Sequence, residues 1–484
     1  MVKKRYFRKV AFGIGPHQQL PDDPVIWAQS QLDDIPPLSW QGDVLPGKTL
    51  LDHYAHWVYT DRKVLRKRHK KDRKAYRAAK EELRHKTGER YFENLELCIR
   101  HDAAVNSGAP VFERFWWFWC NHFAITDKDF MPQFTTGPYH REILRQNMCG
   151  TFEALTVAAT TSWAMIHNLD NSESVGPNSK SGRYDRQKGR SVSLNENHAR
   201  ELLELHTVSP AAGYTQDDVI SLAKIMTGWE HQHTKKRQEC NPVKFNQDLH
   251  EPGTHHLFGK AYAQNGLSAK NKLIDVIKDL AAHPETAKFI AMKLCRHFVC
   301  DHPSPEIIQP VLDAWTKSNG DLPTVHKAVV AVAYEHADQF EKMQPPEIWL
   351  MQMVNMTGAS WPPAPSQMQY DFRSKPRRIV RSPQQMLREL GHNPYRPTQP
   401  NGWPDTMIEW LSPELLIRRL ALAKRVGDKM FRHGGWKPRH MIDSNFDSPD
   451  EVFAHIGARD GSFDMVNPSV AIQLLFPSKW MVIS

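Results

Sequence analysis

The chain has 484 residues and carries 63 Lys and Arg against 54 Asp and Glu, a formal net charge of +9. The excess is local, because residues 61–90 hold 14 basic and 5 acidic residues and the remainder is neutral. An apolar fraction of 40% excludes a disordered chain, and no apolar run reaches the roughly 18 residues of a membrane span. The six cysteines form no C-x-x-C pair, which indicates reduced, mostly buried thiols. The N-terminus lacks the apolar run of a signal peptide, so we expect a cytoplasmic protein unless a precursor's N-terminus is missing.

Helical periodicity runs through most of the sequence, and the alternation typical of strands is nearly absent. We therefore predict an all-α or predominantly α fold: one large multi-helix body over residues 1–484 with long polar loops. A soft boundary near residue 265 is the alternative. Short strands are expected only near 243–245 or 379–381. The predicted helices are 50–59, 62–85, 89–104, 111–123, 140–147, 152–165, 194–207, 216–227, 270–282, 284–298, 305–317, 324–336, 347–357, 383–390, 413–426 and 468–475.

Start signals accompany several of these helices. The residues from Thr215 to Asp218 resemble a capping box, and Pro284 and Pro305 stand where first-turn prolines belong. Two long stretches lack periodicity and are predicted to be loops. Residues 171–191 are polar and glycine-rich, and residues 231–264 are rich in His, Pro and Gly.

The basic segment 61–90 is predicted to be a charged helix with only a thin apolar stripe. A solvated helix face is the simplest interpretation. The alternative is a docking surface for an acidic partner, a phosphate-rich polymer or an anionic membrane surface. Because the excess charge is confined to this segment, we interpret the chain as a neutral protein with one basic helix.

Residues Gly42 to Thr49 match the phosphate-binding expression G-x-x-x-x-G-K-[ST]. Such a loop holds phosphates with backbone N–H groups and a Lys, and it must follow a buried strand. The residues before Gly42 are polar and proline-rich, so a nucleotide site is only a minor hypothesis.

The chain also carries a series of distinctive aromatic and polar segments. They are 115–123 (FWWFWCNHF), 137–142 (GPYHRE), 169–178 (LDNSESVGPN), 194–207 (LNENHARELLELHT), 213–219 (GYTQDDV), 227–229 (TGW), 293–298 (KLCRHF) and, more weakly, 402–405 (GWPD). In this order they resemble one bacterial family, the domain of unknown function 1800. The sequence departs from the family's pattern at Cys120, where His is usual, and at Glu251, where Asp is usual.

The resemblance implies no activity, because none is established for that family. Its members are often exported, which leaves a periplasmic location open beside the cytoplasmic one. They are also often encoded beside alkaline-phosphatase-like proteins of equally uncertain role.

The predicted helix 194–207 is the most informative segment. At 100° per residue, Asn197, Arg200, Glu201 and Glu204 share one polar face, and His206 lies among apolar residues on the other. Glu204 and His206 are about 160° apart on an intact helix, so they cannot easily bind one metal. The polar face is either a solvated surface with Glu–Arg pairs or the wall of a buried pocket.

We predict an enzyme with a buried polar pocket that performs acid–base hydrolytic or transfer chemistry, with or without a metal. Carboxylate, His and Arg in one enclosure suit proton transfer, and we expect them to converge within one pocket's width. The catalytic candidates are Glu196, Arg200, Glu201, His122, Asp170 and His206. The candidates for substrate binding are Asn171, Asn195, Asn197, Trp229, His250, Arg296 and His297. The sequence names no metal, cofactor or substrate.

Each candidate also has a structural interpretation. His122 and His206 can be hydrogen-bonded core histidines, and Asp170 and Asn171 can cap a helix. His250 lies in the His-rich loop and is the histidine that we expect to be most available for chemistry. The competing hypothesis for the whole chain is a non-catalytic scaffold or partner-binding protein. A haem protein that uses His206, and nucleic-acid binding through the basic helix, are minor hypotheses.

Overall fold

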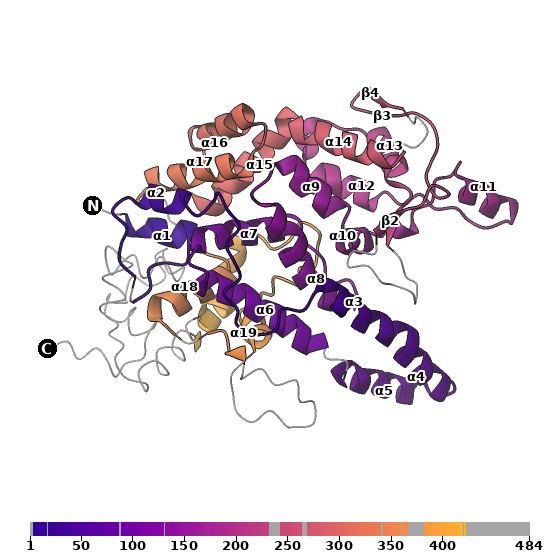
Figure 1. Ribbon diagram of the computed structural model, residues 1–484, viewed down its shortest axis with the longest axis horizontal. Helices are drawn as coiled ribbons and strands as arrows, with labels where there is room; N and C mark the ends of the chain where they lie inside the picture. The colour runs from indigo at the N-terminus through magenta and orange to yellow at the C-terminus, as the bar shows by residue number, and fades with distance from the viewer. Residues whose placement is uncertain are drawn as a thin grey trace.

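The computed structural model describes residues 3–16, 18–86, 89–129, 131–231, 243–263, 269–339, 342–359, 361–365, 382–419 and 421–422. The described chain is predominantly helical, as predicted (Figure 1). Its helices are α1 (Lys4–Val10), α2 (Pro24–Gln29), α3 (Gly47–His56), α4 (Arg62–Arg68), α5 (Arg73–Lys86), α6 (Glu89–Asn106), α7 (Pro110–His122), α8 (Pro132–Pro138), α9 (Phe152–Thr160), α10 (Trp163–Asn168), α11 (Lys180–Gln187), α12 (Asn197–Glu201), α13 (Gln216–Met226), α14 (Asn271–Ala282), α15 (Pro284–Phe298), α16 (Pro305–Ser318), α17 (Leu322–Glu335), α18 (Pro346–Thr357) and α19 (Pro383–Glu389).

Shorter helical turns connect several of these helices. Three are π-helical: η1 (Trp57–Asp61), η2 (Tyr139–Leu144) and η5 (Leu202–His206). The others are 3-10 turns: η3 (Arg145–Asn147), η4 (Asn171–Glu173), η6 (Pro210–Ala212) and η9 (Met407–Trp410).

Two small antiparallel sheets complete the described fold. Strands β1 (Trp229–His231) and β2 (Val243–Phe245) pair with Trp229 opposite Phe245. Strands β3 (His255–Leu257) and β4 (Lys260–Tyr262) pair with His255 opposite Tyr262. The predicted strand at 243–245 is thus confirmed, whereas residues 379–381, the boundary near 265 and the helix at 468–475 lie outside the described residues.

The predicted helix starts are confirmed. Thr215 and Asp218 form a reciprocal capping box at the start of α13, and Pro284 and Pro305 occupy the first turns of α15 and α16. Each arrangement satisfies or removes one of the backbone N–H groups that have no partner within a helix. Local sequence therefore determines where these helices begin.

The core is organised around α7, which runs through the middle of the molecule (Figure 1). The five aromatic residues from Phe115 to Trp119 are at most 4% exposed. Side chains of α15, α17 and α18 join them in the larger apolar cluster. A second cluster forms around α12, α13 and α14. These aromatic side chains are thus at the centre of the larger core.

The prediction of a loop over residues 171–191 is wrong in part, because residues 180–187 form α11. Ser179 caps this helix by accepting a hydrogen bond from the Gly182 N–H. A Cβ atom on Gly182 would collide with the carbonyl oxygen of Gly176. The glycines that suggested a loop are therefore needed where the backbone folds closely on itself.

The predicted helix 194–207 is shorter than expected and changes its geometry. Regular α-helix covers Asn197–Glu201, and a π-helical turn follows over Leu202–His206. The Thr207 hydroxyl closes this turn by donating to the Leu202 carbonyl at 2.6 Å. The expected burial of Leu202, Leu203 and His206 is confirmed.

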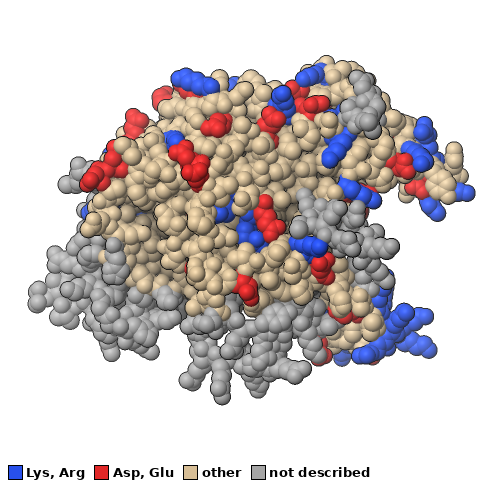
Figure 2. Space-filling view, in the orientation of Figure 1, with Lys and Arg blue, Asp and Glu red and all other residues tan. Residues whose placement is uncertain are grey.

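The basic segment forms two helices, α4 and α5, and not one continuous helix. The chain breaks at residues 69–72, where Asp72 accepts hydrogen bonds from the N–H groups of Lys74 and Ala75. This pair projects from the body of the molecule, and its surface is strongly basic (Figures 1 and 2). In the described part of the chain, no helix combines the length and apolarity that crossing a membrane requires.

The phosphate-binding expression at Gly42–Thr49 does not have the structure of a nucleotide loop. Residues 31–46 contain no strand, and the N–H of Gly47 donates to Glu142 Oε1 at 2.8 Å. A Cβ atom on Gly42 would lie 2.7 Å from Trp40 Nε1. This glycine allows close packing against an indole ring and does not face a phosphate.

Candidate functional site

The carboxylate face of helix α12 lies on the surface. Glu196 Oε2 accepts hydrogen bonds from Arg200 at 3.1 Å and from Gln216 at 2.7 Å. Asn197 is exposed, and burial together with the neighbouring Glu204 raises the pKa of the half-buried Glu201. Of the two interpretations of this polar face, these contacts correspond to a solvated surface with a Glu–Arg pair and not to the wall of a buried pocket.

A second group of candidates joins the start of this helix to the turn after α10. Asp170 has a left-handed backbone (φ 58°), and its carboxylate pairs with Lys128. Asn195 Nδ2 donates to the Asp170 carbonyl at 3.3 Å. Asn171 is buried and donates to the carbonyl of Trp229 at 2.7 Å. The side-chain amides of Asn195 and Asn171 thus both donate to backbone carbonyls.

His250 is 2% exposed, although we expected it to be the most available histidine. Its Nδ1 lies 2.8 Å from the Thr227 carbonyl, and its Nε2 has no partner among the described residues. Burial lowers the pKa of this imidazole. The His-rich sequence therefore folds inward because the backbone offers His250 a hydrogen-bond acceptor.

His122 and His206, which the prediction placed in one pocket, do lie together. Their ring centroids are 6.0 Å apart, and His122 Nε2 lies 3.2 Å from the His206 carbonyl. Lys293 Nζ donates to His122 Nδ1 at 2.9 Å. Burial lowers the pKa of His206 to about 3 and that of Lys293 to about 8. Because both imidazoles stay neutral, Lys293 carries the positive charge of this group.

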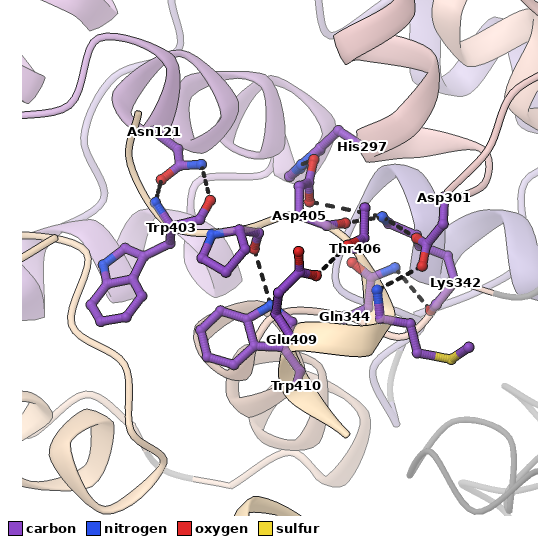
Figure 3. Close-up of polar contacts among 12 residues, drawn as sticks. Asn121, His297, Asp301, Lys342, Gln344, Trp403, Asp405, Thr406, Glu409 and Trp410 are labelled. Atoms are coloured by element: carbon purple, nitrogen blue, oxygen red, sulfur yellow. Dashed lines mark hydrogen bonds and ion pairs between the residues drawn. The ribbon is translucent and has the colours of Figure 1, made fainter. Parts of the chain in front are cut away.

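Arg296 and His297 follow one turn later on α15. Arg296 is half-buried, and its Nε has no partner among the described residues. His297 is 6% exposed, and its Nδ1 lies 2.8 Å from Asp405 Oδ2 (Figure 3). Of the predicted site residues, His297 is the one whose Nδ1 pairs with a carboxylate while its Nε2 has no partner among the described residues.

The charges of this pair follow from its surroundings. Burial alone would raise the pKa of Asp405, but His297, Lys342 and Arg114 outweigh it and lower that pKa to about 2. Burial lowers the pKa of His297 in spite of Asp405. At neutral pH the carboxylate therefore accepts the Nδ1 proton, and the lone pair of a neutral imidazole is left on Nε2.

Asp405 itself is held by a cation from the segment that precedes α18. Lys342 Nζ donates to Asp301 Oδ1 at 2.6 Å and to the backbone carbonyl of Asp405 (Figure 3). Asp301 Oδ2 in turn accepts the N–H of Met407 at 2.6 Å. These contacts fix the loop that carries Asp405 against α15 and the start of α18.

Asn121, at the end of α7, fixes the other side of this loop. Its amide donates to the Trp403 carbonyl at 2.9 Å and accepts the Trp403 N–H at 2.8 Å (Figure 3). Gly402 has φ 76°, and a Cβ atom there would collide with the Asn121 carbonyl. Glycine is therefore required where the loop meets the helix.

A second buried ion pair lies beside His297. Arg100 on α6 donates to both oxygens of Glu347 on α18, at 3.0 and 3.2 Å, and its guanidinium lies 4.3 Å from the Trp117 ring. His101 Nε2 is 3.1 Å from Glu347 Oε1. Burial alone would raise the pKa of Glu347, but Arg100 and His101 lower it to about 2. Glu347 is therefore ionised at neutral pH.

These two pairs face one small cavity of about 40 Å³ between α6, α7, α15, α18 and the 392–405 loop. Such a volume has room for about two or three water molecules or one small chemical group. Burial raises the pKa of the lining thiol of Cys120 to about 12, so this thiol stays protonated. The cavity-lining side chains on which the proposals below rest are those of Arg100, Trp117, Cys120, His297, Glu347, His392 and Asp405.

Comparison with known proteins decides the family. The family model described as "Protein of unknown function (DUF1800)" matches residues 8–468. The chain belongs to the DUF1800 family. No curated protein and no solved structure matches it. The resemblance seen in the sequence is thereby confirmed.

Three of the segments that resemble the DUF1800 family meet at the cavity. Segment 115–123 contributes Trp117, Cys120 and Asn121, segment 293–298 contributes His297, and segment 402–405 contributes Trp403 and Asp405. These segments lie far apart in the sequence, so only the fold brings them together. The Asn195–Glu201 segment, which seemed most informative in the sequence, does not line this cavity.

Sequence reasoning missed four polar residues of this DUF1800 cavity: Arg100, Glu347, His392 and Asp405. A signal for Glu347 was present, because it stands alone as a charge in the otherwise apolar α18. Among the described residues, no group of three or more His, Cys, Asp or Glu could hold a metal ion.

Proposed function

We propose that this DUF1800 protein is an enzyme that uses His297 as a general base for hydrolytic or group-transfer chemistry. One observation carries the proposal: the Nδ1 of His297 is held by the Asp405 carboxylate, and its Nε2, on a residue that lines the cavity, has no partner in the described part of the chain. This is the arrangement that a base needs, because the partner on Nδ1 sets the tautomer and leaves Nε2 to accept a proton.

In the proposed reaction, His297 Nε2 takes the proton of a water or hydroxyl nucleophile as that nucleophile attacks an electrophilic carbon. The resulting imidazolium is stabilised by Asp405 and later gives its proton to the leaving group. Arg100 also lines the cavity and would stabilise negative charge that develops on the reacting group. The small cavity would hold the reacting group while the remainder of a substrate lies outside it.

Replacing His297 by Gln is expected to lower turnover by about 10²-fold or more, and Asp405→Asn should have a similar effect. The measurement is hydrolysis of a panel of p-nitrophenyl esters and p-nitroanilides by the purified protein. Circular dichroism would check the fold of each variant. The matched control is His302→Gln, which removes an exposed histidine four residues beyond α15 and should leave the rate unchanged. The proposal fails if the natural chain turns over no member of the panel, or if both variants retain its rate.

A second candidate function is binding of a nucleic-acid backbone by two basic projections. Helix α11 and the residues that follow it carry a second group of exposed basic side chains, Lys180, Arg183, Arg186, Lys188 and Arg190. Helix α11 and the α4–α5 pair both project on the right of Figure 1, and blue surface marks both in Figure 2. A membrane-bound helix would need a broad exposed apolar face, whereas Val64 and Tyr184 are the large exposed apolar side chains here. Repeated phosphates suit these surfaces better.

We expect the chain to bind a short DNA duplex with an affinity that falls about 10³-fold between about 50 and 200 mM salt. Replacing Arg66, Lys67 and Arg77 by Glu should abolish this binding. The control replaces three exposed lysines elsewhere, Lys278, Lys288 and Lys317, by Glu with the same change of charge. Equal losses in the two triple variants would mean that net charge alone drives binding, and the assignment to the projections would be wrong.

A further inference from the structure

Four residues that line the cavity carry a buried nitrogen without a hydrogen-bond partner among the described residues. They are Arg100 Nη1, Trp117 Nε1, His297 Nε2 and His392 Nδ1. All four residues are at most 6% exposed. Buried polar atoms are rarely left without partners, so four around one cavity indicate a missing group.

The missing group must accept hydrogen bonds. Arg100 Nη1 and Trp117 Nε1 can only donate, and both oxygens of Glu347 and one oxygen of Asp405 already have donors. Both oxygens of Glu347 accept from Arg100, and Asp405 Oδ2 accepts from His297. A ligand with several acceptor oxygens would therefore satisfy Arg100 and Trp117, whereas the lone pair on His297 Nε2 is left to accept the proton of the nucleophile.

The surrounding charge also favours an anion. Glu347 balances the charge of Arg100, whereas Lys342 with Asp301 and Asp405 has a net charge of −1, so Arg114 and Arg419 leave the described groups with one positive charge in excess. Arg114 and Arg419 have no carboxylate partner among the described residues: Arg114 donates to the Lys9 carbonyl and to Gln344, and Arg419 donates to the Gln344 carbonyl. The region around Gln344, next to the cavity-lining Pro345, therefore holds more positive than negative charge.

We infer that the cavity binds a small oxyanion, a carboxylate or phosphate group, through Arg100 Nη1, Trp117 Nε1 and His392. The inference rests on the proposed function in one respect, since it takes this group to be the anionic part of the substrate. Water could also fill the cavity, but water would leave the surplus positive charge uncompensated. An anionic group anchored here would lie beside Nε2 of His297, where a proton is to be transferred.

The test is isothermal titration calorimetry of the full chain with acetate, with inorganic phosphate and with acetamide, at constant ionic strength. Acetamide is the uncharged counterpart of acetate, so tighter binding of acetate or phosphate isolates the contribution of the charge. We expect at least one of the two anions to bind at least tenfold more tightly than acetamide. The difference between acetate and phosphate shows which kind of anion the site prefers. Binding of neither anion above the level of acetamide would mean a water-filled cavity and would overturn the inference.

The matched variants are Trp117→Phe and Trp349→Phe. Each removes a buried indole N–H to which no described residue offers a hydrogen-bond acceptor, but of the two only Trp117 lines the cavity. Trp117→Phe should weaken anion binding about tenfold, the effect of losing one hydrogen bond to a charged group, and Trp349→Phe should not change it. His392→Phe is a second cavity variant with the same expectation. The inference is also overturned if Trp117→Phe binds the anion as tightly as the natural chain does. If Trp117→Phe does not fold, the same comparison is made with His392→Phe.

Binding and turnover separate this inference from the proposed function. Anion binding without any turnover would leave the anion site standing and remove the general base. Turnover that depends on His297, without anion binding, would support the general base and remove the anion site.

Discussion

Replacing Glu113 by Ala is expected to lower the free energy of unfolding by about 3–5 kcal/mol. Glu113 is fully buried in α7 and accepts hydrogen bonds from Arg145 at 2.7 and 3.5 Å. The Arg145 guanidinium lies between aromatic rings, 5.1 Å from Phe112 and 5.4 Å from Trp116. Without the carboxylate, this cation would remain in the core with no compensating charge.

The pair itself contributes less than this loss suggests. Burial raises the pKa of Glu113 in spite of the neighbouring Arg145, so the interior opposes the ionised carboxylate. The double variant Glu113→Leu, Arg145→Met should therefore recover most of the lost stability, because both charges are removed together. Chemical denaturation of the single and double variants measures both effects.

The control is an exposed ion pair. Lys288 Nζ lies 2.7 Å from Glu285 Oε1, and its side chain is 58% exposed. Lys288→Ala should change the free energy of unfolding by less than about 0.5 kcal/mol. If Glu113→Ala were equally mild, water would have to reach Arg145, and the burial described for this pair would be wrong.

The protein is expected to unfold steeply in mild acid, near pH 5. Burial lowers the pKa of His198, His206 and His326 to about 3, whereas a histidine of the unfolded chain titrates near about 6.5. Between these values the unfolded chain binds more protons than the folded one, so stability is present above about pH 6.5 and is lost as the pH falls. With three such histidines, the free energy of unfolding falls by about 4 kcal/mol for each pH unit below this range. A total free energy of unfolding of about 5–15 kcal/mol is therefore lost within a few pH units.

Two of these histidines show why protonation is resisted. His326 Nε2 accepts the indole N–H of Trp119 at 3.0 Å, and its ring stacks 4.0 Å from Phe115. Protonation of this nitrogen would abolish the hydrogen bond and place a charge in the aromatic core. His198 is 1% exposed, and neither of its ring nitrogens has a partner among the described residues.

His198→Leu should reduce the pH slope by about 1.4 kcal/mol per unit, the contribution of one proton. Urea denaturation at several values between pH 7 and pH 5 measures the slope. The control, His302→Leu at an exposed position, should not alter it. A slope unchanged by His198→Leu would mean that His198 is protonated in the folded chain.

Local structure was largely accessible from the sequence. The helix predicted at 111–123 is observed at 110–122, because its aromatic run and preceding proline are local signals. The π-helical turn at 202–206 was not accessible, since hydrophobic periodicity does not distinguish one extra residue in a turn. The helix α11 was missed because its composition is that of a loop, although Ser179 is a recognisable cap.

The candidate site was accessible only in part. His297 was named, but its partner Asp405 lies 108 residues further along the chain. In the sequence, Asp405 was marked only as part of the weakly resembling segment 402–405. A loop sequence has no periodicity from which the orientation of its side chains can be predicted. The pairing of Asp405 with His297 depends instead on tertiary contacts, those that Asn121 and Lys342 make with this loop.

The loop held by Asn121 has a consequence for the synthesis of the chain. Trp403 follows Asn121 by 282 residues, and Glu347 follows Arg100 by 247. At about 5–20 residues per second, the ribosome delivers Trp403 roughly 15–60 s after Asn121. During this interval α7 presents its polar end without a partner, and Arg100 lacks its counter-ion. The cavity therefore cannot exist on a nascent chain that has not yet reached Asp405, so its chemistry is withheld until that residue has been synthesised and has left the ribosome.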